Sequence, residues 1–358
     1  MSLLKEFHLL VCGLAVLALA PAAMARVIRV PEDAPNVAAA VTDAVNGDSI
    51  DIASGVWKGG IDLQGKAILL RGQASGRTVL TGRDAIGPVI SCLNGEGPGT
   101  VLEDLILREG HGQAIPGFPT MTIGGGLLCA GASPTVRNCT FERNVSTLSG
   151  GGVYCGGGSS PLFEKCTFSG NQSEKGGAAI CVDSSPRFVG CTFEANRATF
   201  AGGGIYAADN SAATVEGGRF VRNIAGFTGG GIYEYDAMTN VTNAVFDRNR
   251  ATLRGGAAFL GHDSRGTLDR CHYMSPTDEV AGSRLSLLRP PTRGACALDR
   301  WCVQSEESDC LLAGGVYLGD HVTCSEQTVQ AGKKRAGDVD FDGEVDDHDM
   351  ALLMLLWR

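Results

Sequence analysis

The most specific pattern for chemistry in this sequence is an acidic run near its C-terminal end. It reads Asp-Val-Asp-Phe-Asp-Gly-Glu-Val-Asp-Asp-His-Asp over residues 338–349, with a glycine at the sixth position. Calcium needs about six to eight hard oxygen ligands wrapped by a tight turn, and this spacing supplies them. We therefore expect bound Ca²⁺. The predicted ligands are Asp338, Asp340, Asp342, Asp346 and Asp349, together with the backbone carbonyl of Glu344.

A short apolar segment follows this acidic run. Leu352, Leu353 and Leu356 belong to a predicted helix that is apolar on most faces, which requires a partner in the same chain or in another. Loop and helix together resemble one half of a type I dockerin, a module that carries two such halves. The resemblance implies a calcium-binding tail over residues 331–358 that docks or anchors the protein, with a cohesin-like receptor as its expected partner.

Acidic residues also recur further upstream, each after a glycine-rich segment. Stacked carboxylates repel one another unless a cation or solvent screens them, so a shared Ca²⁺ is one interpretation. The other, which we favour, is an Asx turn repeated by duplication. The residues are Asp183, Asp209, Asp236 and, shifted by one position, Asp263.

Large apolar residues recur within the same glycine-rich segments. If Val153 and Ile205 face inward, these residues face outward, and an exposed aromatic stripe could stack on sugar rings or on a partner protein. Tyr154, Tyr206 and Tyr233 are the candidate binding residues. The alternative, which we favour, is that a loop covers the stripe or that this assignment of faces is wrong. Its members are Leu128, Tyr154, Ile180, Tyr206, Tyr233 and Phe259.

Six cysteines recur at matching positions in two series. Cys129, Cys155 and Cys181 form one series. Cys139, Cys166 and Cys191 form the other. Buried free thiols behave as small hydrophobic groups, and we favour this role over disulfides or a metal site. Zinc is disfavoured because no Cys-x-x-Cys pair and no histidine accompanies them.

Two motifs in register reveal the elements that must position these residues. Glycine clusters begin at residues 124, 150, 176, 202, 229 and 255. A Phe-x-x-Asn motif alternates with them and begins at residues 141, 168, 193, 220 and 246. A fixed period of this length is typical of a solenoid, in which each unit buries its apolar side against its neighbours. Each unit reads as three short strands. We expect an inward column of phenylalanines, and a column of asparagines whose amides bond along the stack.

One spacing within the unit requires a bend. Val136 and Cys139 are three residues apart, whereas Cys139 and Phe141 are two apart, so a tight turn is predicted before the cysteine.

The paired motifs carry a resemblance to a known family. Gly-Gly-Gly-aliphatic and Phe-x-x-Asn resemble the repeats of chlamydial polymorphic outer membrane proteins, within the right-handed parallel β-helix, or pectin-lyase-like, superfamily. The resemblance covers residues 101–273. Residues 30–53 are similar to the helical cap and first strand of such helices. The resemblance to this superfamily implies an all-β, right-handed parallel β-helix over residues 26–290. An N-terminal helical cap is expected, together with small C-terminal disulfide-rich and EF-hand-like appendages.

Composition changes after Pro290-Pro291. Four cysteines lie within residues 291–330, at Cys296, Cys302, Cys310 and Cys324. Because a module this short buries only a small hydrophobic core, we expect two disulfides to stabilise it. A zinc site is the alternative. The segment resembles small four-cysteine modules of planctomycete-type secreted proteins.

The first 25 residues are typical of a secretory signal. Lys5 precedes an apolar run, and Ala23-Met24-Ala25 fits cleavage before Arg26. We expect a secreted, periplasmic or cell-surface protein with no membrane span after signal removal. The formal net charge of −9, with no basic run longer than Lys333-Lys334-Arg335, argues against nucleic-acid binding.

These patterns favour a non-catalytic surface protein that binds or displays a polysaccharide or a surface protein. The alternative is a polysaccharide lyase or glycoside hydrolase acting on uronate-containing polysaccharide, and a purely structural spacer is a third hypothesis. In pectate lyases, calcium held by aspartates acidifies a uronate and a nearby arginine takes the proton. Arg187, Arg222 and Arg248 are the candidates for that base.

Overall fold

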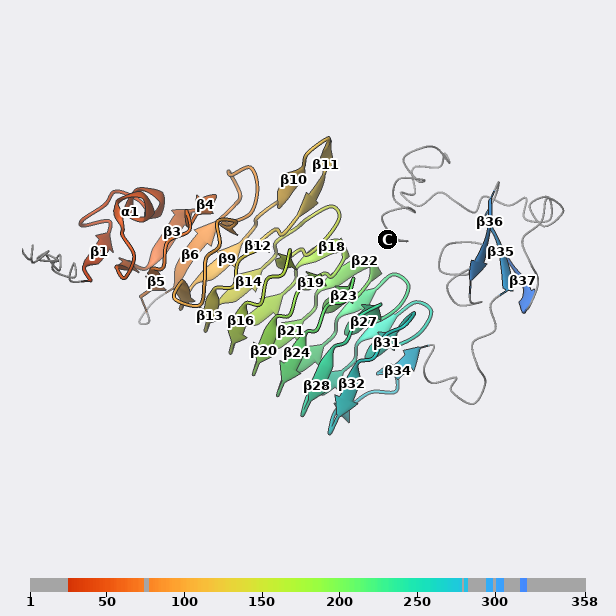
Figure 1. Ribbon diagram of the computed structural model, residues 1–358. Helices are drawn as coiled ribbons and strands as arrows, with labels where there is room; N and C mark the ends of the chain where they lie inside the picture. Colours follow the sequence, from red (N-terminus) through yellow and green to blue (C-terminus); the bar gives the residue numbers. More distant parts are fainter. Residues whose placement is uncertain are drawn as a thin grey trace, which may run out of the picture.

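The computed structural model is an all-β, right-handed parallel solenoid (Figure 1). The structure describes residues 25–73, 77–278 and 280–282, and the backbone of residues 294–298, 301–305 and 316–320. The signal segment and the calcium-loop prediction at residues 338–349 therefore lie outside the described residues. No helix in this described part is long and apolar enough to cross a membrane.

Three parallel sheets run the length of the solenoid, and each coil gives one strand to each sheet. Sheet A contains, in spatial order, β1 (Val27–Val30), β2 (Ser49–Ile52), β5 (Leu69–Gly72), β8 (Val101–Glu103), β13 (Thr135–Arg137), β16 (Leu162–Glu164), β20 (Arg187–Val189), β24 (Thr214–Glu216), β28 (Asn240–Thr242) and β32 (Thr267–Asp269). Sheet B contains β3 (Gly55–Lys58), β6 (Thr78–Thr81), β9 (Ile106–Arg108), β14 (Thr140–Glu142), β17 (Thr167–Ser169), β21 (Thr192–Glu194), β25 (Arg219–Val221), β29 (Val245–Asp247) and β33 (His272–Tyr273). Sheet C contains β4 (Ile61–Asp62), β7 (Ile90–Cys92), β12 (Leu127–Ala130), β15 (Val153–Gly156), β19 (Ala179–Val182), β23 (Ile205–Ala208), β27 (Ile232–Tyr235), β31 (Ala258–Leu260) and β34 (Val280–Gly282).

Smaller sheets complete the strand set. Sheet D, which the sequence did not predict, contains β18 (Gln172–Lys175), β22 (Arg197–Ala201), β26 (Ile224–Ala225) and β30 (Arg250–Ala251). A hairpin joins β10 (Gln113–Ile115) to β11 (Phe118–Ile123). In the four-cysteine segment the backbone forms an antiparallel sheet of β35 (Gly294–Leu298), β36 (Trp301–Ser305) and β37 (Val316–Asp320). The predicted disulfides of that segment lie outside the described side chains.

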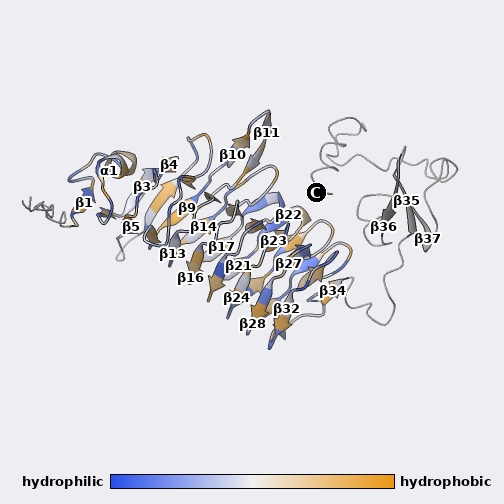
Figure 2. Cartoon of the chain, in the orientation of Figure 1, coloured by the Kyte–Doolittle hydropathy of each residue, from blue (hydrophilic) through white to orange (hydrophobic). Residues whose placement is uncertain are grey.

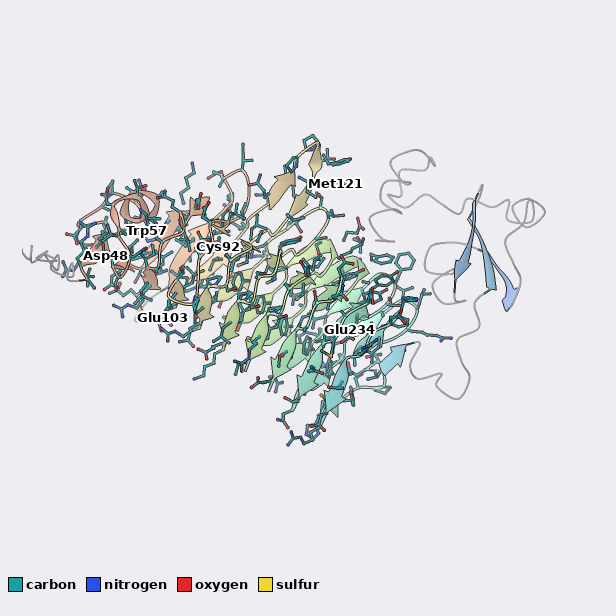
Figure 3. The ribbon with its side chains drawn as sticks, viewed as in Figure 1. Asp48, Trp57, Cys92, Glu103, Met121 and Glu234 are labelled. Atoms are coloured by element: carbon teal, nitrogen blue, oxygen red, sulfur yellow. The ribbon has the colours of Figure 1, made fainter. Side chains whose placement is uncertain are left out.

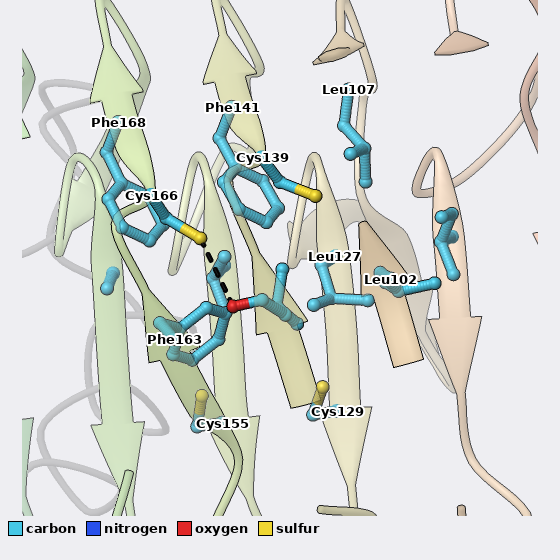
Figure 4. Close-up of a cluster of buried hydrophobic side chains, with 14 of the residues drawn as sticks. Leu102, Leu107, Leu127, Cys129, Cys139, Phe141, Cys155, Phe163, Cys166 and Phe168 are labelled. Atoms are coloured by element: carbon cyan, nitrogen blue, oxygen red, sulfur yellow. Dashed lines mark hydrogen bonds between the residues drawn. The ribbon is translucent and has the colours of Figure 1, made fainter. Parts of the chain in front are cut away.

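The core is built from columns of like side chains, as predicted. Most strands of sheets A and B are three residues long with only the middle residue buried, so hydrophobic and hydrophilic residues alternate along the coils (Figure 2). Phe141 and Phe168 stack at 4.8 Å between ring centroids, and Phe168 and Phe193 at 4.9 Å. A second phenylalanine column from sheet A meets this one edge-on (Figure 4). Burying one such ring contributes about 1.5–3 kcal/mol, and ring stacking adds about 0.5–1.5 kcal/mol.

The predicted turn between sheets A and B is present in each regular coil. Asn138 and Lys165 adopt left-handed backbone conformations, with φ of 51° and 52°. The turn changes the direction of the chain within two residues. It therefore lets Val136 and Cys139 both face the interior although they are three residues apart.

The predicted asparagine column is also present, and every member is fully buried. Asn171 shows the repeated pattern, because its Nδ2 donates to Phe141 O at 2.9 Å and to Asn196 Oδ1 at 2.9 Å. Each asparagine side chain thus satisfies hydrogen-bonding groups of its neighbours along the stack. The column runs through Asn144, Asn171, Asn196, Asn223 and Asn249.

A short helix closes the N-terminal end of the solenoid, as the resemblance implied. Helix α1 (Val37–Asp43) is capped by Asn36, whose side chain accepts a hydrogen bond from Ala39 N at 2.9 Å. Val37, Ala40 and Val41 are buried against the first coils. An apolar helix at this position covers strand edges that would otherwise remain open.

Candidate functional site

The outer face of sheet C was the predicted binding surface, and the structure changes its interpretation. The stripe from Leu128 to Phe259 does face away from the solenoid interior, but most of its members are covered. Tyr206 is 5% exposed and Tyr233 is 4% exposed. Both pack in a second hydrophobic cluster with Phe200 and Ala201. The expected exposure of these two rings is therefore wrong, because strand β22 of sheet D covers them.

The glycine motif explains how this cover is held close to the stripe. Gly202 has a φ of 67°, and a Cβ at this position would lie 2.8 Å from the Cβ of Tyr206. Only glycine adopts this conformation at such a short approach without strain. The repeated glycines thus bring the chain from sheet D to sheet C directly over the aromatic column.

Lys175 lies where sheet D meets this covered stripe. It is the last residue of β18, and its Nζ is 5.8 Å from the centroid of the Phe200 ring. That distance is within the range of a cation–π contact. Burial lowers the pKa of Lys175 from its usual value, although the neighbouring carboxylates of Glu174 and Asp209 oppose the shift. Lys175 is thus a partly desolvated amine beside aromatic rings.

Asp209 directly follows β23, and its charge interacts with that of Lys175. Burial and the nearby Asp236 carboxylate raise the pKa of Asp209, while Lys175 partly offsets the shift. Burial, followed by the charges of Asp209, Tyr235 and Glu174, raises the pKa of Tyr206 as well. We call this group the Lys175 cluster: Lys175, Tyr206, Asp209, Tyr235 and Asp236. Titratable groups whose pKa values shift in opposite directions at one place are typical of functional sites.

The repeated aspartates lie at turns and have left-handed backbone conformations. Asp183, Asp209 and Asp236 have φ of 46°, 53° and 51°, in the left-handed region that aspartate tolerates better than most residues. Asp263 has the same conformation, with φ of 46°. Among the described residues, no group of three or more His, Cys, Asp or Glu side chains is placed to hold a metal ion.

Two aromatic rings remain accessible at the edge of the cover. Tyr154, one of the predicted binding residues, is only partly buried, and burial raises its pKa. Tyr235 is also partly exposed and stacks on His262 at 5.9 Å between ring centroids. Tyr154 borders the Lys175 cluster and Tyr235 belongs to it, so aromatic faces and carboxylates lie together on one accessible edge.

The arginines proposed as a base lie elsewhere. Arg187 bonds to Glu216 at 2.9 Å on sheet A, and Arg248 bonds to Asp247 at 2.9 Å beside sheet B. Arg222 is paired with Glu194. None of the three belongs to the Lys175 cluster, so the arginine-base hypothesis is not supported for these residues.

The coil cysteines are buried free thiols, as favoured from the sequence. Cys129 pairs in register with Cys155 and with Cys92, which extends the first series by one coil. Burial raises the pKa of Cys181 to about 12. The Sγ of Cys166 donates to Val136 O at 3.4 Å (Figure 4). These thiols fill the core and are not exposed to a substrate.

Lys175 itself was missed from the sequence. It occupies the position just before a glycine cluster, where other coils carry small, apolar or basic residues: Ile123, Ser149, Ala201, Thr228 and Arg254. A lysine preceding Gly176-Gly177 was a visible irregularity of the repeat. What the sequence could not show is that the next coil covers this position with Phe200.

A separate hollow lies at the junction of sheets A and B. It has a volume of about 210 Å³, and its polar lining includes Arg77, Asp104 and Asn138. Its lining includes no member of the Lys175 cluster and no aromatic ring.

The match to a family model agrees with the fold. A family model described as "Right handed beta helix region" matches residues 120–246, the central coils. The chain is similar to the solved structure of a pectin methylesterase from carrot, with 12% sequence identity, 73% of this chain and 86% of that chain covered, and a TM-score of 0.46. No curated protein matches the chain. The finer resemblance to chlamydial repeats and the dockerin-like loop stay predictions.

Proposed function

We propose that this protein is a secreted or cell-surface β-helix that binds a polysaccharide at the accessible edge of sheet C. The observation that carries the proposal is the grouping of Lys175, Asp209 and Tyr206 with the partly exposed rings of Tyr154 and Tyr235. Sugars present apolar C–H faces that pack on aromatic rings, and hydroxyl groups that bond to carboxylates. Both kinds of partner lie here on one edge.

The charges at this edge favour a neutral polysaccharide. Asp183, Asp209 and Asp236 outnumber Lys175, and the whole chain carries a formal net charge of −9. An anionic polymer would be repelled unless cations screened these carboxylates. A neutral glycan meets no such penalty, and the acidic oxygens accept hydrogen bonds from its hydroxyl groups.

The predicted tail supports a role in docking. A calcium loop at residues 338–349 with an apolar segment after it would place the solenoid at a surface, through a cohesin-like receptor or another partner. The resemblance of the repeats to chlamydial surface proteins is consistent with this location. If the ligand is a surface protein and not a polysaccharide, we expect it to bind the same accessible edge of sheet C.

A lyase acting on uronate-containing polysaccharide is the second candidate, and one observation favours it. Burial lowers the pKa of Lys175 and raises that of Asp209, which suits a general base and a general acid. Lys175, once deprotonated, would take the proton beside the uronate carboxylate. The electron pair would form the new double bond, and the glycosidic oxygen would leave with a proton from Asp209.

Affinity electrophoresis separates the two candidates. The purified protein is run in gels containing neutral or uronate-containing polysaccharides, and the same mixtures are assayed for unsaturated ends. We expect retardation by a neutral polysaccharide that is lost in Lys175→Met and retained in Lys165→Met, a control at an exposed turn. Unsaturated ends that require Lys175 would support the lyase. Unchanged mobility in every gel, with no product formed, would reject both candidates.

A further inference from the structure

A buried carboxylate lies at the N-terminal end of the solenoid, beside helix α1 (Figure 3). Asp48 is 2% exposed. It accepts hydrogen bonds from Arg26 N at 3.0 Å, from Arg26 Nε at 2.8 Å and from Val45 N at 2.9 Å. The guanidinium of Arg26 also donates to Asp43 O at the end of α1. Backbone and side chain of one residue, Arg26, thus converge on one buried carboxylate.

We propose that Asp48 is a receptor for the new N-terminus formed when the chain is cut between Ala25 and Arg26. The proposal rests on the sequence prediction that residues 1–25 are removed after Ala25. The cut converts the backbone N–H of Arg26 into an α-ammonium group at the atom that already lies 3.0 Å from Asp48 Oδ1. Hydrolysis of that peptide bond adds water across it and needs no other reactant.

Charge makes this contact stronger after cleavage than before. An α-amino group has an ordinary pKa of about 7.7–8.0, so most of it is protonated at neutral pH. Hydrogen bonds between ionised partners are about twice as strong as those between neutral partners. Because the carboxylate of Asp48 is almost fully buried, solvent and salt screen the new ion pair less than at a fully exposed site, although the Arg26 side chain is 53% exposed.

The geometry selects one cleavage position. A cut one residue earlier would leave an amide at Arg26 and place the charge about 3.8 Å further along the chain. A cut one residue later would remove Arg26 and, with it, both of its donors to Asp48. Cleavage at Arg26 alone places the ammonium against the carboxylate. Arg26 precedes β1 directly, so this contact would fix the first strand against α1.

The test compares melting temperatures of three chains that end at Arg358. One begins with a free Arg26, one begins at Ala25, and one begins with Nα-acetylated Arg26. We expect the free Arg26 chain to melt about 2–4 °C above both others. The difference should disappear when Asp48→Asn is introduced into each chain.

Two outcomes would overturn the proposal. Equal melting of the free and acetylated Arg26 chains would show that the ammonium adds nothing to the amide. N-terminal sequencing of the exported protein that begins at any residue other than Arg26 would show that the processing differs. The comparison of free and acetylated chains keeps Asp48 intact, so it remains decisive even if Asp48→Asn fails to fold.

Discussion

The side-chain amide of Asn249 donates to the carboxylate of Asp278 at 3.0 Å, and this bond ends the asparagine column. Each asparagine in the column accepts from the preceding coil and donates to the next, so the last partner needs only to accept. Asp278 meets that requirement because an ionised carboxylate has no donor. It also accepts from the backbone N of Asn249 and of Arg248, both at 2.9 Å.

Replacing this terminal acceptor should destabilise the last coils. Asp278→Ala leaves the donors of Asn249 and Arg248 without a partner, and each unsatisfied buried group costs about 1–3 kcal/mol. We expect the free energy of unfolding, measured by denaturant titration, to fall by about 2–4 kcal/mol. Asp269→Ala on exposed β32 is the control and should change it by less than about 0.5 kcal/mol. Equal effects of the two substitutions would contradict this role.

Interrupting the column in the middle should have a similar effect. Asn196 Nδ2 donates to Phe168 O and to Asn223 Oδ1, both at 2.9 Å, and its Oδ1 accepts from Asn171. Asn196→Ala should therefore lower the unfolding free energy by about 2–4 kcal/mol. The matched change Asn240→Ala, on the outer face of sheet A, should have a much smaller effect. A loss of stability no larger than that of Asn240→Ala would show that the column is dispensable.

The coil thiols should be unreactive until the protein unfolds. Burial raises the pKa of Cys139 and of Cys181 to about 12, so thiolate is scarce at pH 8. Cys271 is only partly buried. We expect pulse alkylation followed by peptide mapping to label Cys271 first among the described cysteines, and the others only in denaturant. Alkylation of Cys139 in the native protein at the rate of Cys271 would contradict this packing.

Acid should weaken the N-terminal end of the solenoid through Asp48. Burial opposes ionisation, but hydrogen bonds from the Arg26 side chain and from the backbone N of Val45 and Arg26 outweigh it and lower the pKa of Asp48 to about 2. A pKa below its unfolded value gives stability that is present above about pH 4 and is lost as pH falls towards 2. In Asp48→Asn the unfolding free energy should be lower at neutral pH and should fall less between pH 4 and 2; an unchanged pH dependence would place the effect elsewhere.

Periodicity predicted most of the solenoid because each coil repeats one pattern of buried positions. Phe168 and Asn171 recur at fixed spacing, and both are fully buried, so their columns could be read directly. The left-handed turn at Lys165 followed from a change of spacing between inward residues. The buried columns and the turn depend on local geometry that is repeated in each coil.

The candidate site could not be predicted in the same way because it depends on what covers a repeated face. Tyr154 and Tyr206 occupy equivalent positions, yet Tyr154 is partly exposed and Tyr206 is buried. Tyr206 is buried in a cluster with Ala201 of the added strand β22, whereas Tyr154 lies with Phe200 at the margin of that cluster. Lys175 belongs to the site because Phe200 of the same added strand lies over its amine. The candidate site therefore arises from differences between coils, and the repeated pattern does not predict these differences.

The most direct test measures dissociation constants for the polysaccharide that retards the protein. Lys175→Met should fold with an equal or higher melting temperature, since it removes a charge that burial disfavours. Lys175→Met and Tyr235→Ala should each raise the dissociation constant about tenfold or more. Lys165→Met and Phe118→Ala, which change exposed positions elsewhere, should leave it unchanged. Binding that is equally strong in all four variants would contradict a binding site at the edge of sheet C.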